Sequence, residues 1–594
     1  AGAAVVDATP TKFPVIVNGM FTERSTSRVT DPIQVRALAL SDGKTTLTIA
    51  VVDSCMVPRD LIDRARAGIS NVLVSSTHTH SAPSAMGCLG TDPDPEYPKF
   101  LEGRITEALK KAVDDLRPAQ AGWTSIAAPK HTYTRRWILR SDKVRKDPFG
   151  DATIRANMHP GYQNPDFIGP SGPTDPEMTL LSIRTREGAP LAVLANYSMH
   201  YFDSAPLSAD YCGAWRRQVE KAMGGGIAIM SQGTSGDQMW MDYGSPKKSV
   251  ALEDYAAGLS APAVEALKGV EHKAAVALGA SETAMRLRRR TPDAKRLEWA
   301  RTLADGRKPK TQQEVYAREA VLLHETPEVE LRLQALRIGD GLIAAWPNEV
   351  FAVSGLKLKA AFPRVMNVSL ANGAEGYIPP PEQHGLGGYT TWPARTAALE
   401  VGAEPKIVEA LLSLMEGLAG APRRPFVEPE TDHSRAVRAA KPTAYWRMGE
   451  LEAAAVGGKT AVLEGRYALA IEGAVHLVGG RFVSDLPLGE TWTVEFRVWR
   501  GHGHGAIFDL LAFNPEGRLT LGPPTGATAV ALRTWAHVAV VRKDGRTRVW
   551  LNGLGELDVE GPGPKSLVLG EGLEGRLDEV AIYARALTPE ELRR

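Results

Sequence analysis

The pattern of apolar and polar positions predicts a mixture of strands and helices over about the first 420 residues. Residues 31–53 contain two apolar runs, IQVRALAL and TTLTIAVVD, on either side of the turn sequence SDGK, which predicts a β-hairpin. A strand is expected at 71–74 and a helix near 97–116. This succession is typical of a mixed α/β domain with a large sheet and helices.

Two later segments of this part have patterns of their own. Residues 290–330 are rich in charge and have helical periodicity, which predicts a helical insertion at the surface. The apolar run 341–346 predicts a strand that leads into Pro347, Asn348 and Glu349. Since proline and asparagine favour turns and helix starts, we expect a helix after this point.

The pattern changes near residue 420. Residues 421–441 contain prolines and charges without a hydrophobic period, which predicts a linker. From 442 to 594 the apolar runs are short, include GAIFDLLAF, and alternate with glycine-rich turns. This arrangement is typical of an all-β jelly roll or sandwich. We therefore expect an α/β domain over 1–420, a linker over 421–441 and a jelly roll over 442–594.

Length and charge narrow the possible functions. With 594 residues the chain is too long for one ordinary core, so more than one domain is expected. The 70 Lys and Arg residues nearly balance the 69 Asp and Glu residues, which argues against a nucleic-acid or polybasic membrane partner. No apolar stretch approaches the ~20 residues of a transmembrane helix.

The chain start and the cysteines bear on the cellular compartment. The chain begins with AGAAVVDATP rather than methionine, as a mature chain does after removal of a signal peptide, which favours a secreted or periplasmic protein. A shortened chain would begin in the same way. The three cysteines are too few for a disulfide framework. One pair could form, for which Cys88 and Cys212 are our choice, and three buried thiols are the alternative.

The segment SSTHTHSAPS carries the first candidate chemistry. His78 and His80 lie two residues apart directly after the apolar run at 71–74. If the strand continues to His80, both imidazoles lie on one face, where they could bind one metal or divide metal binding and proton transfer between them. Two hydrogen-bonded structural histidines are the alternative. A second pair, His502 and His504, lies among glycines in the all-β part and is not expected to form a site.

Other metal-capable groups follow predicted strands. His200 ends the run PLAVLANYSM, Glu349 follows the strand at 341–346, and Tyr377 and Tyr389 lie in GYIPPPEQHGLGGY. A single histidine after a strand is more often structural than a ligand. The repetition of the pattern favours a site, because α/β sites lie at strand ends.

These blocks, in this order, resemble the neutral ceramidase family. NVLVSSTHTHSAP resembles its Thr-His-Thr-His-Ser-Gly-Pro strand, LANYSMH the strand of its second zinc histidine, WPNEVFAVSGLKLK its Pro-Gly-Glu helix start, and GYIPPPEQHGLGGY its Tyr-Val-Thr-Thr block. The gapped resemblance covers roughly residues 10–420. It implies one Zn²⁺ ion per chain and hydrolysis of an amide, and it implies the following roles. The zinc ligands would be His78, His200, Glu349 and Tyr377; His80 would be general base and acid, Tyr389 would stabilise the oxyanion, and Arg135 would orient the substrate, with Arg136 in its place if the register slips by one.

The resemblance is incomplete in several places. SQGTSGDQMW resembles the family's Asn-Ala-Gly-Asp loop, which makes Asp237 a secondary candidate, and Asp210 is another in the segment after His200. The family's Gly-Pro-Gly-Gly is replaced by Ala82 to Ala85, and its Thr-Thr by Pro379 and Pro380. The resemblance therefore supports zinc amide hydrolysis better than it supports ceramide as the substrate.

The last part of the chain resembles a different family. AYWRMGE, TWAHVAVVRKDGRTRVWLNG and GRLDEVAIYARALTPEEL are similar to a laminin-G-like, concanavalin-type jelly roll. This jelly roll would replace the immunoglobulin-like domain of the ceramidases, which helps to hold a second divalent ion in that family. A structural Ca²⁺ or Mg²⁺ ion therefore stays possible here, but we assign no residues to it. Such modules bind carbohydrate or only pack against a neighbouring domain.

Three functions are open at this point. The first is a secreted zinc amidohydrolase acting on the N-acyl bond of a small amphiphilic substrate, ceramide-like or otherwise. The second is a carbohydrate-active lyase, esterase or deacetylase that uses His80, Tyr389 and Arg135 on a glycan. The third, a binding protein on a decayed scaffold, is disfavoured by the four ligand positions. Barrel amidohydrolases also begin with His-x-His, but the all-β end of the chain argues against them.

Overall fold

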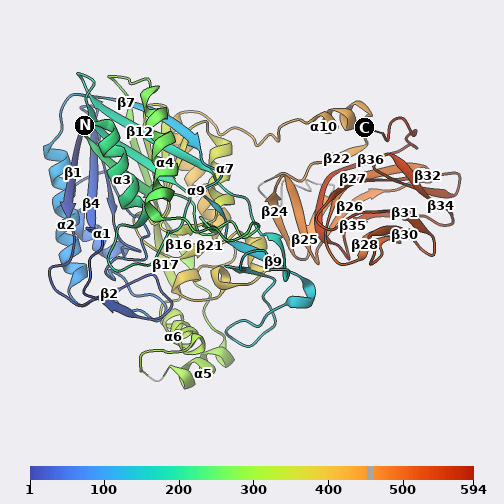
Figure 1. Ribbon diagram of the computed structural model, residues 1–594, viewed down its shortest axis with the longest axis horizontal. Coiled ribbons are helices and arrows are strands. Elements are labelled where there is room, and N and C mark those ends of the chain that lie inside the picture. The colour runs from blue at the N-terminus through green and yellow to red at the C-terminus, as the bar shows by residue number, and fades with distance from the viewer. Residues whose placement is uncertain (305, 451–460, 594) are drawn as a thin grey trace.

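The computed structural model describes residues 1–304, 306–450 and 461–593, and it has a mixed α/β part followed by an all-β part (Figure 1). This confirms the predicted fold class. Residue 305 of the expected helical insertion and residues 451–460 of the expected jelly roll lie outside the described residues. None of the described helices is both long enough and apolar enough to cross a bilayer.

The first sheet of the α/β part contains the predicted hairpin. Its strand order is β1-β4-β5-β6, with β4 and β5 antiparallel and β5 and β6 parallel. Helix α2 packs on it through a stripe of buried residues at helical spacing, such as Leu101, Ile105 and Leu109. The elements are β1 (Gly2–Asp7), β4 (Gln34–Ser41), β5 (Thr46–Val52), β6 (Val72–Ser76), α1 (Arg59–Ala65) and α2 (Tyr97–Asp114).

Two further four-stranded sheets complete this part. Their strand orders are β14-β13-β12-β7 and β16-β17-β18-β20. Apolar side chains of all three sheets, including Leu38, Leu194 and Ile343, share one buried cluster, so the sheets pack around a common core. The bounds are β7 (Ala119–Ala127), β12 (Glu177–Thr185), β13 (Pro190–Tyr197), β14 (Ile227–Gln232), β16 (Leu278–Arg288), β17 (Glu328–Ile338), β18 (Gly341–Ala345), β20 (Val365–Val368), α3 (Asp210–Met223), α4 (Leu252–Lys268), α7 (Ala352–Ala361) and α9 (Ala403–Ala419).

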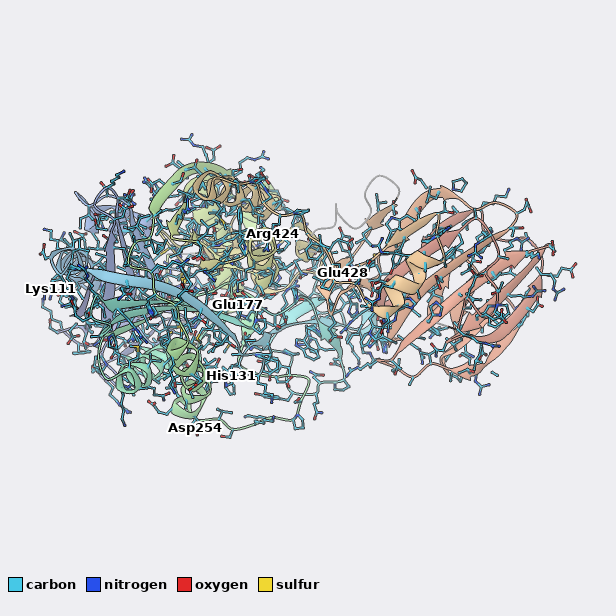
Figure 2. All side chains as sticks on the ribbon, turned by 90° about the horizontal axis from the view of Figure 1, so that it is seen from above. Lys111, His131, Glu177, Asp254, Arg424 and Glu428 are labelled. Carbon is cyan, nitrogen blue, oxygen red and sulfur yellow. The ribbon has the colours of Figure 1, made fainter. Side chains whose placement is uncertain are left out.

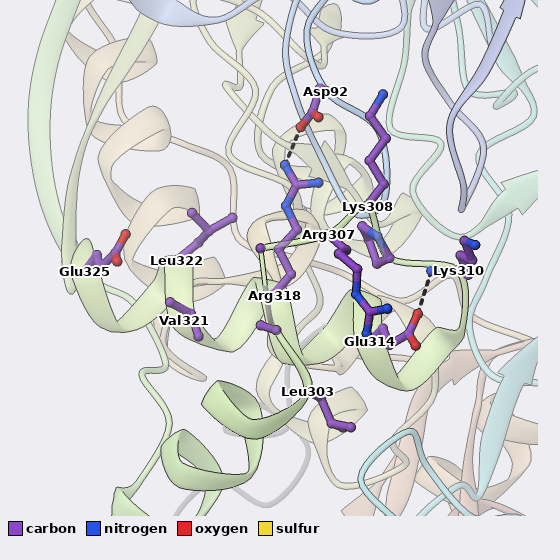
Figure 3. A pocket seen from close by; sticks show the side chains of 13 residues that line it. Asp92, Leu303, Arg307, Lys308, Lys310, Glu314, Arg318, Val321, Leu322 and Glu325 are labelled. Carbon is purple, nitrogen blue, oxygen red and sulfur yellow. Dashed lines mark hydrogen bonds and ion pairs between the residues drawn. The ribbon is translucent and has the colours of Figure 1, made fainter.

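The charge-rich segment forms the expected helices, α5 (Ala294–Leu303) and α6 (Gln312–Glu325). Helix α6 begins with a capping box in which Thr311 and Glu314 satisfy each other's backbone amides. Both helices project from the lower edge of the α/β part in Figure 1. The cavity between them is lined largely by charged side chains, and Arg318 in it pairs with Asp92 (Figure 3).

Short strands connect the sheets near their ends. Strand β8 pairs with β15, β9 lies between β10 and β11, β2 pairs with β3, and β19 runs parallel to β21. Their bounds are β2 (Val15–Val17), β3 (Arg24–Thr26), β8 (Tyr133–Thr134), β9 (Arg136–Leu139), β10 (Ala156–Met158), β11 (Phe167–Pro170), β15 (Gln238–Met239), β19 (Glu349–Val350) and β21 (Tyr377–Ile378).

The all-β part is a sandwich of two sheets. One has the order β24-β25-β36-β27-β32-β33-β34, with β22 paired to β36, and the other has the order β23-β26-β35-β28-β29-β30-β31. The segment GAIFDLLAF is not a single strand, because the chain turns at Asp509, which has a φ of 50°, and forms the hairpin β28·β29. The bounds are β22 (Ala444–Trp446), β23 (Ala461–Glu464), β24 (Tyr467–Ile471), β25 (Ala474–Val478), β26 (Arg481–Pro487), β27 (Trp492–His502), β28 (Gly505–Phe508), β29 (Leu511–Phe513), β30 (Arg518–Leu521), β31 (Thr525–Ala529), β32 (Trp535–Lys543), β33 (Arg546–Leu551), β34 (Leu554–Glu560), β35 (Ser566–Leu569) and β36 (Glu574–Tyr583).

The two parts contact each other directly. The predicted linker 421–441 contains helix α10 (Asp432–Ala439), and Arg424 and Glu428 lie between the two parts in Figure 2. Ile138 and Leu386 of the α/β part share an apolar cluster with Trp499 of the sandwich. Arg155 forms a buried ion pair with Glu574 across the same boundary. Residues 421–441 therefore connect two parts of the chain that also have an interface.

All three cysteines of the chain are buried free thiols, so the pairing of Cys88 with Cys212 is wrong. The two residues lie in different apolar clusters, Cys88 with Cys55, and Cys212 with Trp215 on the buried face of helix α3. Burial raises the pKa of the Cys88 thiol to about 12, which keeps it protonated. These cysteines act as core side chains.

Candidate metal centre

The candidate site lies where segments from the three sheets come together. His78 and His80 follow β6, and His200 follows β13. Glu349 begins β19, and Tyr377 begins β21. All five side chains are buried. The structure thus brings together the four proposed ligands and the proposed base, which are spread over 300 residues of sequence.

The histidine pair does not have the expected strand geometry. Strand β6 ends at Ser76, and His78 has a φ of 62°, so the condition that the strand continues to His80 is not met. A left-handed backbone is unfavourable for a residue with a Cβ and persists where the surrounding structure imposes it, often at functional sites. The turn places the two Nε2 atoms 3.2 Å apart. The imidazoles therefore meet through a turn rather than through the alternation of a strand.

Three side-chain atoms converge on one point. The Nε2 atoms of His78 and His200 are 3.0 Å apart. One oxygen of Glu349, Oε2, lies 3.3 Å from the Nε2 atom of His78 and 3.7 Å from that of His200. These separations are of the size expected between ligands of a tetrahedral ion with bonds of ~2.0–2.2 Å.

The hydrogen bonds of the two rings explain why a cation fits there. His78 Nδ1 lies 2.8 Å from the carbonyl oxygen of Cys55, and His200 Nδ1 lies 3.0 Å from that of Ser235. A carbonyl only accepts, so each Nδ1 carries the proton and each Nε2 presents a lone pair. Within the described residues, Glu349 Oε2 has no hydrogen-bond partner. Two lone pairs and a carboxylate oxygen facing one another repel unless a cation lies between them.

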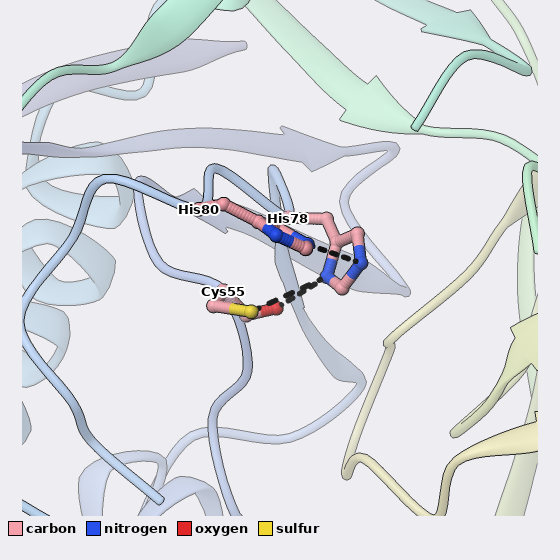
Figure 4. Close-up of side chains that lie close together, drawn as sticks. All are labelled: Cys55, His78 and His80. Carbon is pink, nitrogen blue, oxygen red and sulfur yellow. Dashed lines mark hydrogen bonds between the residues drawn. The ribbon is translucent and has the colours of Figure 1, made fainter. Parts of the chain in front are cut away.

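A second group of metal-capable residues shares His78 but is less suitable. Cys55, His78 and His80 also have ligand atoms within 4.8 Å of one another (Figure 4). The thiol of Cys55 lies 3.7 Å from His78 Nδ1, and that nitrogen already donates to the Cys55 carbonyl. Burial raises the pKa of the Cys55 thiol well above its ordinary value, which opposes the thiolate that a metal needs. We therefore favour the site with Glu349.

Tyr377 lies directly beside the carboxylate. It is the register partner of Glu349 in the β19·β21 pair, and its hydroxyl accepts a hydrogen bond of 2.8 Å from Arg135 Nη2. Burial raises the pKa of the Tyr377 phenol well above its ordinary value, and the charge of Glu349 raises it further. The nearby guanidinium of Arg135 lowers this pKa only in part, so the phenol is neutral without a metal, and a metal ion beside it would favour the phenolate.

His80 has the surroundings of a neutral imidazole. Its ring stacks on Tyr201, with centroids 3.8 Å apart and planes 17° apart. Gly19 packs closely against the imidazole ring of His80, since a Cβ at Gly19 would lie 2.5 Å from His80 Cγ. Burial lowers the pKa of His80 well below its ordinary value, and neighbouring His78 and Arg135 lower it further. An uncharged, tightly held imidazole is suited to accept a proton.

The two adjacent arginines point to different places. Arg135 reaches Tyr377 and the carbonyl oxygen of Gly236. Arg136 instead binds Ser171, Gln383 and the carbonyl of Gly387, all away from the histidines. Since side chains alternate in direction along an extended segment, only one of the two can face the site. The structure places Arg135 there, and Arg136 fixes the loop that leads to Tyr389.

The remaining candidates differ in their distance from the three ligand atoms. The ring of Tyr389 lies 5.7 Å from that of Tyr377, centroid to centroid, and remains partly exposed, so it borders the site. Asp237 accepts from the amide of Ala352 and orients the start of α7. Asp210 accepts from the amides of Phe202 and Asp203 and shapes the loop after His200. These two aspartates are structural supports in this geometry.

Several residues at the site were not expected from the sequence. Cys55 and Ser235 orient the two imidazoles through carbonyl oxygens, which no sequence pattern identifies. Tyr201 and Gly19 contact His80 from segments far away in sequence. A signal existed for Tyr201 alone, because it directly follows the candidate ligand His200.

Comparison with known proteins places the fold. No protein-family model and no curated protein sequence matches this chain. Among solved structures, neutral ceramidase from Pseudomonas aeruginosa is 13% identical, with a TM-score of 0.53 over 98% of this chain and 92% of that one. A structure described as a ceramidase complexed with C2 is 14% identical, with a TM-score of 0.53 over 99% of this chain and 93% of that one. The likeness covers both the α/β part and the sandwich.

Proposed function

Because this chain has a neutral ceramidase-like fold, we propose that it is a zinc-dependent hydrolase that cleaves an amide, or N-acyl, bond. The observation that carries the proposal is the convergence of His78 Nε2, His200 Nε2 and Glu349 Oε2 in a buried site. Two imidazoles and a carboxylate are the ligand set of several catalytic zinc sites, which keep a further position open. Tyr377, beside Glu349, would be a fourth ligand.

The ion and the protein would have separate tasks. When bound, zinc would supply a Lewis acid and lower the pKa of a water molecule in the site. His78 and His200 are oriented for binding by the carbonyl oxygens on their Nδ1 atoms, which fix the tautomer. Glu349 would contribute a negative charge that offsets part of the charge of the ion.

His80 would move the proton. Its imidazole is neutral, lies 3.2 Å from His78 through the Nε2 atoms, and is clamped between Tyr201 and Gly19. It would take a proton from the attacking water and deliver it to the leaving amine, which cannot leave as an anion. Such help is typically worth ~10²–10⁴-fold in rate.

Two further side chains would act on the substrate. Tyr389, at the partly exposed border of the site, would donate its hydroxyl to the oxygen that becomes negative as the carbonyl is attacked. Arg135 would hold Tyr377 in place and present a positive charge to the substrate. Removal of a hydrogen-bond donor that stabilises the developing oxyanion, as Tyr389 would, typically lowers kcat by ~10²–10³-fold.

The proposal is tested with the full-length protein. Zinc content is measured after purification without added metal, and hydrolysis of a panel of N-acyl amides is followed before and after treatment with a chelator. We expect one zinc ion per chain and loss of amide hydrolysis on its removal, with recovery when zinc is returned. Full hydrolysis in a metal-free sample would overturn the proposal.

A further inference from the structure

A cavity of about 200 Å³ lies between the β8·β15 ribbon and helix α4. Its position is marked by His131 and Asp254, which lie close together at one edge of the α/β part in Figure 2. The cavity is smaller than the ~300–1,000 Å³ of pockets for drug-sized ligands, so it suits one ring rather than a long chain. Its aromatic lining residues are Tyr133, Tyr162, Trp240 and Tyr255, with the imidazole of His131.

Two chains of contacts connect this cavity to the catalytic groups. Trp240 stacks on Phe202, with centroids 4.7 Å apart, and the residue before Phe202 is Tyr201, which stacks on His80. On the other side, Tyr162 lies 5.3 Å from the ring of Tyr243. The side chains of Trp240, Phe202 and Tyr201 therefore lie between the cavity and the proposed base.

The second chain ends at the proposed substrate-orienting arginine. The hydroxyl of Tyr243 lies 2.5 Å from His159 Nδ1, and the amide of His159 donates to the carbonyl oxygen of Arg135 over 2.9 Å. His159 has a φ of 54°, a conformation that non-glycine residues adopt mainly where the fold imposes it. The wall between the cavity and Arg135 is thus fixed rather than loosely packed.

The cavity is polar as well as aromatic. The Nδ1 atom of His131 is buried and, in the described part of the chain, has no hydrogen-bond partner. Gly258 of α4 makes room for this ring, since a Cβ there would lie 2.2 Å from His131 Nε2. Lys130, Lys248 and Asp254 add charged groups to the lining.

This combination decides between an alkyl chain and a polar ring. An alkyl chain would cover the hydroxyls of Tyr133 and Tyr162 without satisfying them, and burying a polar group without a hydrogen bond is unfavourable. A sugar ring instead places its C–H face on an aromatic side chain and its hydroxyls on the phenol and lysine groups. Among the exposed large apolar side chains of the described residues, Val250 alone lines the cavity.

We propose that this cavity is a subsite that binds a saccharide ring of the substrate, and that the bond cleaved is the N-acyl amide of an amino sugar. The second half rests on the proposed amide hydrolysis, whereas the first half concerns binding alone. The bond broken is C–N, with water as the only co-reactant and a carboxylate and an amine as products.

The binding half is measured by calorimetry with the zinc-loaded full-length protein and the tetramer of N-acetylglucosamine. We expect binding that weakens about tenfold or more in Tyr162→Ala and in His131→Ala, because each removes a wall of the cavity. Tyr162→Phe should lose less than Tyr162→Ala if the ring face carries the contact. Phe426→Ala removes an aromatic ring from the exposed linker and should bind as the unaltered protein does.

Turnover of an N-acyl anilide that lacks a sugar is measured on the same samples, together with the melting temperature. Unchanged anilide hydrolysis without any binding of the tetramer would overturn the saccharide subsite and leave amide hydrolysis standing. Tetramer binding that is equally strong in Tyr162→Ala, His131→Ala and Phe426→Ala would place the saccharide elsewhere and also overturn it. Cavity-dependent binding without hydrolysis of any amide would support the subsite and contradict the proposed reaction.

Discussion

Glu349 and Tyr377 are register partners in a parallel pair of two-residue strands, β19 and β21. The amide of Glu349 donates to the carbonyl oxygen of Gly376 over 2.9 Å, so the backbone itself fixes their relative positions. This pairing holds a carboxylate and a phenol side by side, although they are 28 residues apart in the sequence. Arg135 then ties the phenol to the loop before β9.

Tyr377→Phe should bind zinc more weakly. The change removes the hydroxyl that accepts from Arg135 and lies next to Glu349. Loss of a group that orients a metal ligand typically costs ~10–100-fold in affinity, and loss of a ligand costs more. The affinity is measured by competition with a chelating dye, and Tyr467→Phe in the sandwich is the matched control. Equal affinities in the two variants would show that Tyr377 has no part in metal binding.

His78→Ala and His200→Ala should each lose the metal, because each removes one of three converging ligand atoms from a buried site. His502→Ala is the matched control, since His502 belongs to the other His-x-His pair and faces Asp142 at 3.8 Å. Elemental analysis of the three purified variants gives the answer. Retention of one zinc ion by His78→Ala would show that the metal is bound elsewhere in the protein.

His80→Ala should keep the metal but lose rate by ~10²–10⁴-fold, because it removes the proton carrier and leaves the three ligand atoms in place. Zinc content and turnover of a small N-acyl amide are measured on one sample. The two outcomes are separable: a metal-free variant would make His80 a ligand, and a metal-loaded variant with normal turnover would remove it from the chemistry.

Stability should depend on pH through Asp210. Burial raises the pKa of this carboxyl to about 7 in the folded protein, against an ordinary value of 3.8. The folded state keeps the proton between these values while the unfolded state has lost it, so the stabilisation is complete below pH 3.8 and disappears as the pH rises to about 7. Asp210→Asn cannot titrate and tolerates the φ of 55°.

The measurement is the melting temperature of the wild type and of Asp210→Asn at several pH values across this window. The melting temperature of the wild type should fall relative to that of the variant as the pH rises through this window. Above the window the difference between the two melting temperatures should be constant. A difference that stays constant throughout would show that the carboxyl has an ordinary pKa in the folded protein.

Residues 1–425 should fold and hydrolyse a small amide without the sandwich, because the buried cluster shared by the three sheets of the α/β part contains no residue of the sandwich. The melting temperature should fall, since truncation exposes Ile138 and Leu386 and leaves Arg155 without Glu574. Loss of turnover in a soluble, zinc-loaded fragment would mean that the sandwich completes the site. Loss limited to polymeric substrates would instead give the sandwich a role in binding glycans.

Much of the fold could be predicted because it follows from local patterns of apolar, polar and turn residues in the sequence. The hairpin β4·β5, helix α2, the insertion α5–α6 and the strands after 442 follow from apolar spacing and turn residues, which act over a few positions. The positions of His200 and Glu349 at strand ends were visible for the same reason. The sequence also identified His78 and His80 as a pair.

Only the tertiary structure decided how these groups meet. A turn with a left-handed backbone at His78 brings the two imidazoles together, and the direction of one residue separates Arg135 from Arg136. The carbonyl oxygens of Cys55 and Ser235 orient the two imidazoles from segments that carry no recognisable motif. Such relationships depend on packing between distant segments, whereas a sequence pattern reports only the preferences of neighbours along the chain.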